Sequence, residues 1–220
     1  MDTPNSSFLT ITAVSLLVLC LSGCSCGADS TSFYNKEPKR DTDFKDSLEE
    51  VIQIFGPEKE LYLSISLKSW GAIFYQGCEE IGSLRYDRTY YDLTDPEENL
   101  IWKMMAHDTK VVVFDAKLNP EISIVRRRDK IEFFDAKGML LFHIDKREDG
   151  FSLFRVSENP EGPDEIIATA MPTDKGISVS NAGGDIKYLT DSEISPLGIV
   201  TIMLPGYDLL EKSALVIMVK

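Results

Sequence analysis

The sequence is poor in histidine, in cysteine outside its N-terminus, and in positive charge. Only two histidines are present, His107 and His143, and no GxSxG, HExxH, P-loop or GxGxxG motif occurs. Histidine is the commonest general base, so this composition favours a non-catalytic protein and predicts no cofactor. Lys and Arg total 23 against 36 Asp and Glu, a net charge of −13. Such a field repels phosphate backbones, and nucleic acid is not expected as a partner.

Three of the four cysteines crowd the N-terminus: Cys20, Cys24 and Cys26, with Cys78 far away. Structural zinc needs a second cysteine pair, so no metal site is expected. If Cys24 is modified and Cys20 removed, Cys26 and Cys78 remain. In an oxidising compartment these two could form a disulfide, and two unpaired thiols are the alternative.

What the N-terminus does contain is an uncharged apolar run at residues 8–21. Its 14 residues are too few for a transmembrane helix, which needs about 20, but they suit the hydrophobic core of a signal peptide. The run is followed by Leu21-Ser22-Gly23-Cys24, which resembles the lipobox of bacterial lipoproteins. The resemblance implies cleavage between Gly23 and Cys24, and attachment of a diacylglyceryl group and fatty acyl chains, such as palmitate, to the Cys24 thiol.

One feature departs from that pattern, since the first seven residues hold Asp2 and no Lys or Arg. A signal peptide cleaved without lipidation is one alternative, and an apolar segment buried in the domain is another. Ser25 follows the cysteine, which by resemblance implies the outer rather than the inner membrane in Gram-negative bacteria. The sequence thus predicts an envelope protein held on a membrane by its N-terminal lipid, with any protein or small-ligand partner unknown.

Three regions follow from this interpretation: a signal peptide at 1–23, a flexible tether at 24–43 and one mainly-β domain at 44–220. The tether is rich in Ser, Asp, Lys and Pro. Cleavage before Cys24 removes Asp2 and no other charge, so the net charge changes from −13 to −12. Such a charge weakens docking on anionic lipid unless a local basic patch overrides it.

From residue 60 onward, short apolar runs alternate with turn residues, and several runs have a period of two, as at Leu140, Phe142 and Ile144. This predicts an α+β fold that is mainly antiparallel β, a meander or closed barrel. Residues 111–130 and 131–150 also form an internal repeat in which Phe-Asp-Ala-Lys recurs. We interpret the repeat as two consecutive hairpin units with aspartate in the turns.

Two helices and an apolar C-terminus complete the expected fold. Residues 43–57 place Phe44, Leu48, Val51, Ile52 and Phe55 at helical spacing and predict an N-terminal amphipathic helix. The run Asp95-Pro96-Glu97-Glu98 has the composition of a helix start, which predicts an inserted helix at 95–107. The segment from Ser195 onward is apolar but interrupted by Pro205-Gly206, and it is expected to be buried as helix, strand or both.

The run from Phe134 through Gly138 to Ile144, with the final ALVIMV, resembles the tubby-like and phospholipid-scramblase superfamily. The resemblance covers roughly residues 60–220 and implies a barrel that encloses an apolar C-terminal helix. The expected helix at 95–107 and Pro205 depart from it, and no ligand-binding residue is carried over.

Several clusters of side chains could form sites, and each also has a structural explanation. The acidic group Asp92, Asp95, Glu97 and Glu98 could bind calcium, but it lacks the spacing of a calcium loop. Arg126, Arg127, Arg128 and Lys130 form the densest basic patch, in which alternation along a strand end would separate the arginines. Tyr86, Tyr90, Tyr91 and Trp102 could line a sugar site or simply pack across strands. His143 is expected to be a packed strand residue, and His107 to end a helix.

The sequence is compatible with three functions. The first is a non-catalytic, lipid-tethered binding or structural module. The second is an exported hydrolase that uses paired carboxylates. The third is a barrel that binds lipid or its headgroups, which predicts an apolar-lined groove or a basic surface around residues 126–128.

Overall fold

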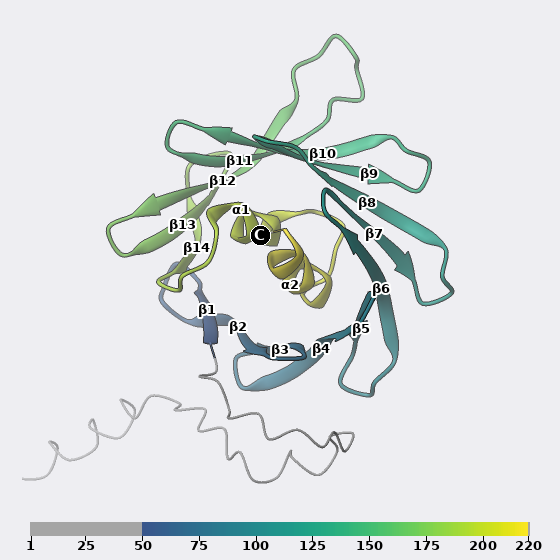
Figure 1. Ribbon diagram of the computed structural model, residues 1–220. Coiled ribbons are helices and arrows are strands. Elements are labelled where there is room, and N and C mark those ends of the chain that lie inside the picture. The colour runs from purple at the N-terminus through teal and green to yellow at the C-terminus, as the bar shows by residue number, and fades with distance from the viewer. Residues whose placement is uncertain (1–49, 220) are drawn as a thin grey trace, which may run out of the picture. The chain divides into compact units, whose positions relative to one another are not determined.

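The computed structural model describes residues 50–219, which form fourteen strands followed by three short helical segments (Figure 1). The strands are β1 Glu50–Phe55, β2 Leu61–Lys68, β3 Gly71–Gln76, β4 Glu79–Asp87, β5 Tyr90–Thr94, β6 Leu100–His107, β7 Lys110–Asp115, β8 Pro120–Arg126, β9 Lys130–Asp135, β10 Leu140–Arg147, β11 Gly150–Arg155, β12 Glu165–Thr173, β13 Gly176–Asn181 and β14 Ile186–Thr190. The helical segments are α1 Pro196–Ile199, η2 Val200–Met203 and α2 Leu209–Met218.

Each strand pairs antiparallel with the next, and β1 pairs with β14 to close the barrel. The predicted antiparallel meander is therefore confirmed in its closed form. The closing ladder is short, because only Phe55 of β1 and Leu189 of β14 are register partners. Beside it the Gln53 backbone N–H donates to Ser192 Oγ at 3.0 Å. All the strand pairs lie within the described residues, so this part of the chain contains the whole barrel.

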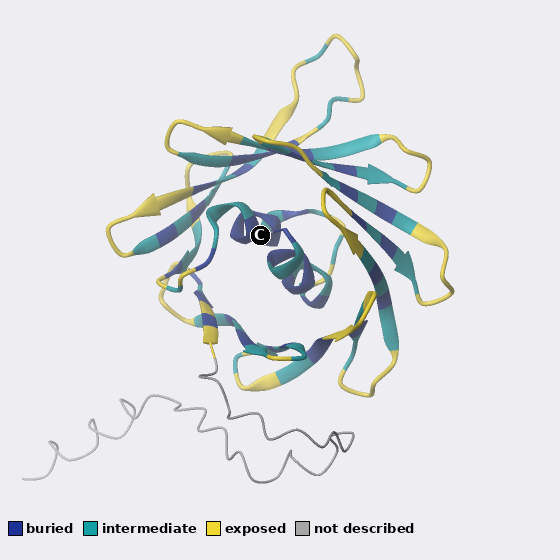
Figure 2. Cartoon of the chain, viewed as in Figure 1, coloured by how far each residue is buried: buried dark blue, intermediate teal, exposed yellow. Residues whose placement is uncertain are grey.

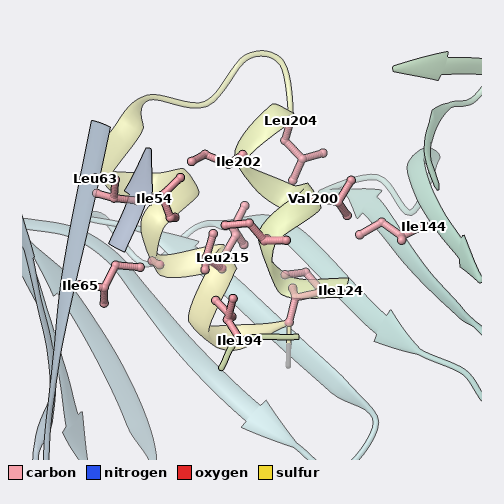
Figure 3. Packing of buried hydrophobic residues seen from close by; sticks show 14 of the residues in the cluster. Ile54, Leu63, Ile65, Ile124, Ile144, Ile194, Val200, Ile202, Leu204 and Leu215 are labelled. Carbon is pink, nitrogen blue, oxygen red and sulfur yellow. The ribbon is translucent and has the colours of Figure 1, made fainter. Parts of the chain in front are cut away.

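The three helical segments fill the inside of the barrel (Figure 1). Ala214, Leu215 and Val216 of α2 are fully buried. Figure 3 shows the Leu215 side chain in the middle of the apolar cluster, with Ile54 and Ile65 of the wall and Ile202 of η2 around it. Along the wall, buried residues alternate with more exposed ones, as expected for strands with one face on a core (Figure 2). The expected burial of the C-terminal apolar segment is confirmed, and the segment is helical.

Local sequence explains where the helices start. Ser195 caps α1, with its hydroxyl accepting from the Leu197 backbone N–H at 3.2 Å. Asp208 and Glu211 form a reciprocal capping box at the start of α2. No helix among residues 50–219 combines the length and apolar character needed to cross a membrane.

The internal repeat is confirmed as consecutive hairpin units, with β7 and β8 in one unit and β9 and β10 in the next. In both turns the aspartate organises the backbone. The Asp115 carboxylate accepts from the backbone N–H groups of Lys117 and Asn119, and the Asp135 carboxylate from those of Lys137 and Met139. The assignment of Phe-Asp-Ala-Lys to turn formation therefore agrees with the structure.

Both predicted helices before the C-terminal segment are wrong where the structure describes them. Residues 50–55 of the expected helix at 43–57 form β1, in which Ile52 and Ile54 are buried at a period of two. Residues 100–107 of the expected helix at 95–107 form β6, which buries Trp102 and Met104. The turn before β6 starts at Asp95, whose carboxylate accepts from the Asn99 backbone N–H at 2.8 Å. It repeats the Asp115 turn, so the apparent helix cap is turn chemistry.

Candidate functional site

The two ends of the barrel differ in charge. Because the strands are antiparallel and consecutive, connections after odd-numbered strands lie at one end and those after even-numbered strands at the other. Counted with the strand residue on either side of each connection, the odd connections carry thirteen acidic and four basic residues, and we call this the acidic end. Counted in the same way, the even connections up to β13 carry nine basic and six acidic residues, and we call this the basic end. Glu50 at the start of β1, with Asp191 and Glu193 after β14, adds three acidic residues at this end, so that its acidic and basic residues are equal in number.

Positive charge at the basic end is concentrated on three neighbouring connections, at residues 107–110, 126–130 and 147–150, which we call the basic rim. Its cations are Lys110, Arg126, Arg127, Arg128, Lys130 and Arg147. The rim is braced by backbone hydrogen bonds between adjacent turns, from Arg126 N–H to the Thr109 carbonyl at 2.7 Å and from Lys146 N–H to the Asp129 carbonyl at 3.1 Å. Its backbone is therefore held as a continuous surface.

A cavity of about 350 Å³ opens inside the basic rim, and we call it the mouth cavity. Its apolar lining comes from the end of α2 and from neighbouring strands: Ile217, Met218, Val219, Tyr91, Ala106, Val111, Ile124 and Ile131. Its polar lining is His107, Asp108, Thr109, Lys110 and Arg126. The carbonyl groups that end a helix carry partial negative charge, which these neighbouring basic side chains complement. A cavity with an apolar floor and an edge that carries Lys110 and Arg126 against Asp108 suits a ligand that has a polar, anionic group and a small apolar part.

The three consecutive arginines point to different surroundings, as alternation along a strand end predicts. Arg126 lines the mouth cavity. The Arg127 Nε donates to Glu132 Oε2 at 2.6 Å. Arg128 is almost fully exposed, with 96% of its side chain accessible. Two of the three therefore remain available to an anionic partner.

Aromatic side chains adjoin the mouth cavity. Tyr86 and Tyr91 are cross-strand partners with ring centroids 4.8 Å apart, and Tyr91 lines the cavity. Trp70 lies on the next connection, where its carbonyl accepts from the Tyr86 N–H and its ring faces the Arg85 guanidinium at 5.5 Å. The expected tyrosine cluster is thus present as cross-strand packing. Trp102 does not belong to it, because its side chain is buried in the core.

The most enzyme-like carboxylates lie beside the start of α2, toward the acidic end. Burial raises the pKa of Glu211, and the charges of Asp208 and Glu121 raise it further. Burial and the nearby charges of Glu121 and Glu211 raise the pKa of Tyr207 to about 12. Both carboxylates nevertheless have structural partners: Glu211 accepts from the Asp208 backbone N–H, and Glu121 from Trp102 Nε1. Neither glutamate lines the mouth cavity or the second cavity described below.

His143 is buried on the outer side of the wall and holds a long connection in place. Its ring stacks on Phe154 with centroids 4.8 Å apart. Nδ1 lies 3.0 Å from Asp145 Oδ1, and Nε2 lies 2.8 Å from Asp164 Oδ2. Asp164 also accepts from the Ser157 backbone N–H, and these bonds hold the pKa of Asp164 below its usual value. His143 therefore holds Asp164 at one end of the β11–β12 connection, and Asp164 in turn bonds Ser157 at the other end. The buried ring agrees with the expectation of a packed strand histidine.

The remaining predicted site residues are the acidic group at 92–98, His107 and the cysteines. The acidic group at residues 92–98 is divided: Asp92 pairs with Lys103 at 2.9 Å, and Asp95 forms its turn. Among residues 50–219 no group of three His, Cys, Asp or Glu side chains is placed to hold a metal ion. His107 ends β6 rather than a helix. Cys78 is disulfide-bonded, whereas Gly23, Cys24 and Cys26, with the predicted signal peptide and tether, lie outside the described residues.

A second cavity, of about 510 Å³, lies beside the barrel closure and is lined by Phe55, Lys59, Leu189 and the β12–β13 turn among others.

The sequence pointed to Arg126 as part of a basic run, but not to His107 and Lys110, which line the mouth cavity with it. The signal was available, because the 20-residue repeat, extended backward from residue 111, places the turn near 107 at the same end of the barrel as the turn near 127.

No protein-family model matches the chain, and no curated protein matches it either. Among solved structures, the X-ray structure of a protein from Arabidopsis thaliana is similar in part. It has 10% sequence identity and a TM-score of 0.41, over 77% of this chain and 90% of its own.

Proposed function

We propose that this chain is a lipid-anchored, non-catalytic binding module of a bacterial cell envelope. The observation that carries the proposal is the filled barrel: α1, η2 and α2 occupy the lumen and bury their apolar side chains there. A lumen packed with the protein's own helices leaves binding to the ends and outer face of the barrel. The best-formed candidate there is the mouth cavity, with His107, Lys110 and Arg126 at its edge.

The lipobox and the polar segment after it support the anchor. Two or more acyl chains give stable membrane attachment, whereas one chain gives only marginal binding. A diacylglyceryl group on Cys24 would supply two. The resemblance to the tubby-like and phospholipid-scramblase superfamily stays part of this proposal, and the helix enclosed by the barrel is consistent with it.

The anchor is tested by expressing the full chain in a bacterial host with labelled fatty acid, followed by membrane fractionation. Wild type should take up label and sediment with membranes. Cys24→Ser should take up none and be either uncleaved or released, because the acyl transfer needs a thiol. Cys26→Ser is the matched control and should behave as wild type. If wild type takes up no label, or Cys24→Ser as much as wild type, a signal peptide without lipidation replaces this proposal.

An exported hydrolase is the second candidate, and the raised pKa of Glu211 beside Glu121 is the observation in its favour. A raised carboxyl pKa is typical of a general acid. The test is turnover by the purified protein on a panel of glycosides and esters, with Glu121→Gln and Glu211→Gln as variants. Turnover that one of these substitutions abolishes would replace the binding module with the hydrolase.

A further inference from the structure

We propose that His143, Asp145 and Asp164 form a proton-operated latch, which holds the β11–β12 connection on the barrel wall while the His143 ring is an imidazolium and releases it when the ring gives its proton to water. The latch goes beyond the proposed function. It is independent of the anchor and of the mouth cavity, because the groups that carry it lie on β9, β10, β11 and the connection at residues 156–164.

The first observation is that both ring nitrogens of His143 face carboxylate oxygens. Nδ1 lies 3.0 Å from Asp145 Oδ1, and Nε2 lies 2.8 Å from Asp164 Oδ2. A neutral imidazole has one N–H donor and one lone pair, whereas an ionised carboxylate only accepts. One of the two contacts would then set a lone pair against a carboxylate oxygen. The imidazolium has two N–H groups and donates to both carboxylates, so this arrangement selects the charged ring.

The second observation is that Asp164 keeps its negative charge beside the ring. Its Oδ1 accepts from the Ser157 backbone N–H at 2.9 Å, and this bond, with the bond from His143, holds the pKa of Asp164 below its usual value. The carboxyl group therefore stays ionised at mildly acidic pH, where histidine is ordinarily protonated. The charged forms of both partners are present together in that range of pH.

The third observation is the burial of two outward-facing side chains. The residue after His143 and the residue before Phe154 belong to the apolar core, so His143 and its register partner Phe154 point away from the lumen. They are nevertheless only 5% and 6% exposed. Arg147 lies over the Phe154 ring at 5.0 Å, and Asp164 brings the connection against the His143 ring. The connection is the longest between two strands of this barrel, so it has the length to move away.

Negative charge predominates around the ring. The connection carries Glu158, Glu161 and Asp164 and no basic residue. On the wall, Asp145 of β10 contacts the ring, and Glu132 of β9 is the register partner of His143 on the side away from Phe154. An imidazolium surrounded by carboxylates is stabilised in its charged form while the connection is docked.

The nearby cations are Arg127 and Lys130, which pair with Glu132 at 2.6 and 3.7 Å, and Arg147, which lies over Phe154. Lys130 also attracts Asp164, but no printed bond joins them that could replace the bond from Nε2. When the ring becomes neutral, Asp145 remains fixed in the ladder of β10, whereas Asp164 lies on a connection that can move. The docked state binds one proton more than the released state, so raising the pH weakens docking.

The test compares hydrogen exchange at residues 157–163 in the purified full chain and in Asp145→Asn. The new amide at position 145 can donate to Nδ1, so a neutral ring can still donate from Nε2 to Asp164. The two proteins share the sequence of the connection, so the intrinsic chemistry of exchange cancels in their ratio at each pH. We expect equal exchange at about pH 5.5, and exchange at least about tenfold faster in wild type than in the variant at about pH 8.5.

Nitrogen-15 NMR of the histidine rings gives a second measurement. At about pH 5.5, both ring nitrogens of His143 should carry protons in wild type. At about pH 8.5, Asp145→Asn should show a neutral ring protonated at Nε2. His107 is the other histidine of the chain and lines the mouth cavity, so His107→Gln is the control and should keep the full pH response.

Three outcomes would overturn the latch. They are equal exchange of wild type and Asp145→Asn at both pH values, a neutral His143 ring in wild type at about pH 5.5, and loss of the pH response in His107→Gln. His143→Gln should abolish the response. If that variant does not fold, Asp145→Asn still decides the question, because it leaves the buried ring in place.

Discussion

Leu118 and Gly138 occupy the same position in consecutive copies of one turn, 20 residues apart, and both have positive φ, 65° and 81° respectively. The preceding aspartates, Asp115 and Asp135, make the same backbone hydrogen bonds in both copies. Gly adopts this conformation freely, whereas a leucine there is strained by its Cβ. The first copy of the repeat therefore carries strain that the second avoids.

Exchanging the residues at these two positions should change stability in opposite directions. Leu118 is largely exposed, so Leu118→Gly loses little packing. It should raise the free energy of unfolding by about 0.5–1 kcal/mol, as relief of strain exceeds the added flexibility of the unfolded chain. Gly138→Leu should lower it by a similar amount. Urea denaturation measures both, and a destabilised Leu118→Gly would show that the turn tolerates leucine without strain.

Gly150, the first residue of β11, should tolerate a side chain much less well than Gly138. At Gly150, with φ of 156°, an added Cβ would collide with the Ala170 carbonyl oxygen of β12, whereas at Gly138 it would meet open space. Gly150→Ala should therefore lower the free energy of unfolding by about 2 kcal/mol or more. Gly138→Ala should lower it by only about 1 kcal/mol. Equal losses in thermal melts of the two variants would contradict the close approach of β11 to β12.

The raised pKa of Glu211 predicts a pH-dependent difference from Glu211→Gln. An acid whose pKa is raised by folding binds its proton more tightly in the folded state, so its contribution is most favourable below the unfolded pKa and is lost as pH rises through the folded pKa. Gln at position 211 can make the same capping-box hydrogen bonds with Asp208 without carrying a charge. Glu211→Gln should thus be the more stable protein at pH 7, and the gap should close as the pH falls to about 4. A constant gap across that range would exclude the burial effect on Glu211.

Removing Asp164 should free the β11–β12 connection without unfolding the barrel. Asp164→Ala loses the bond to His143 Nε2 and the bond from the Ser157 N–H. Hydrogen exchange at residues 157–163 should accelerate at least tenfold, with exchange in β10 and β11 nearly unchanged. Asp145→Ala is the matched control, because Asp145 bonds the same ring but lies on the same strand as His143. If Asp145→Ala releases the connection equally, the histidine and not its bond to Asp164 would be the fastening element.

The sequence predicted the meander because most strands carry their own alternating pattern and each lies next to its partner in the chain. Both incorrect helix predictions were made on short segments whose apolar residues fit the helical period as well as the strand period of two. In β1, Val51 and Ile52 suggested a helix, but burial falls on Ile52 and Ile54. Before β6, the acidic run from Asp95 has the composition of a helix cap, but it forms a turn. Extending the repeat backward from Asp115 to Asp95 would have identified the turn.

The candidate site was less accessible to sequence reasoning because it combines residues from distant segments. Arg126 could be marked as part of a basic run, but its neighbour Val219 belongs to the final helix. The end of α2 reaches the basic rim only because the helix runs back through the barrel. A local sequence pattern does not show that path. The acidic composition of the whole chain also gives no sign that basic residues cluster on three connections at one end of the barrel.

The short closure between Phe55 and Leu189 also bears on how the chain folds. These partners are 134 residues apart, whereas nearly every other strand pair is joined by a tight turn. Hairpins can form early and independently, since closing a short loop costs little entropy. Ring closure must instead wait for both ends of the sheet and for the helices that fill the lumen. A barrel lacking α2 should therefore stall as an open, curved sheet with β1 and β14 as exposed edges, the form most exposed to aggregation.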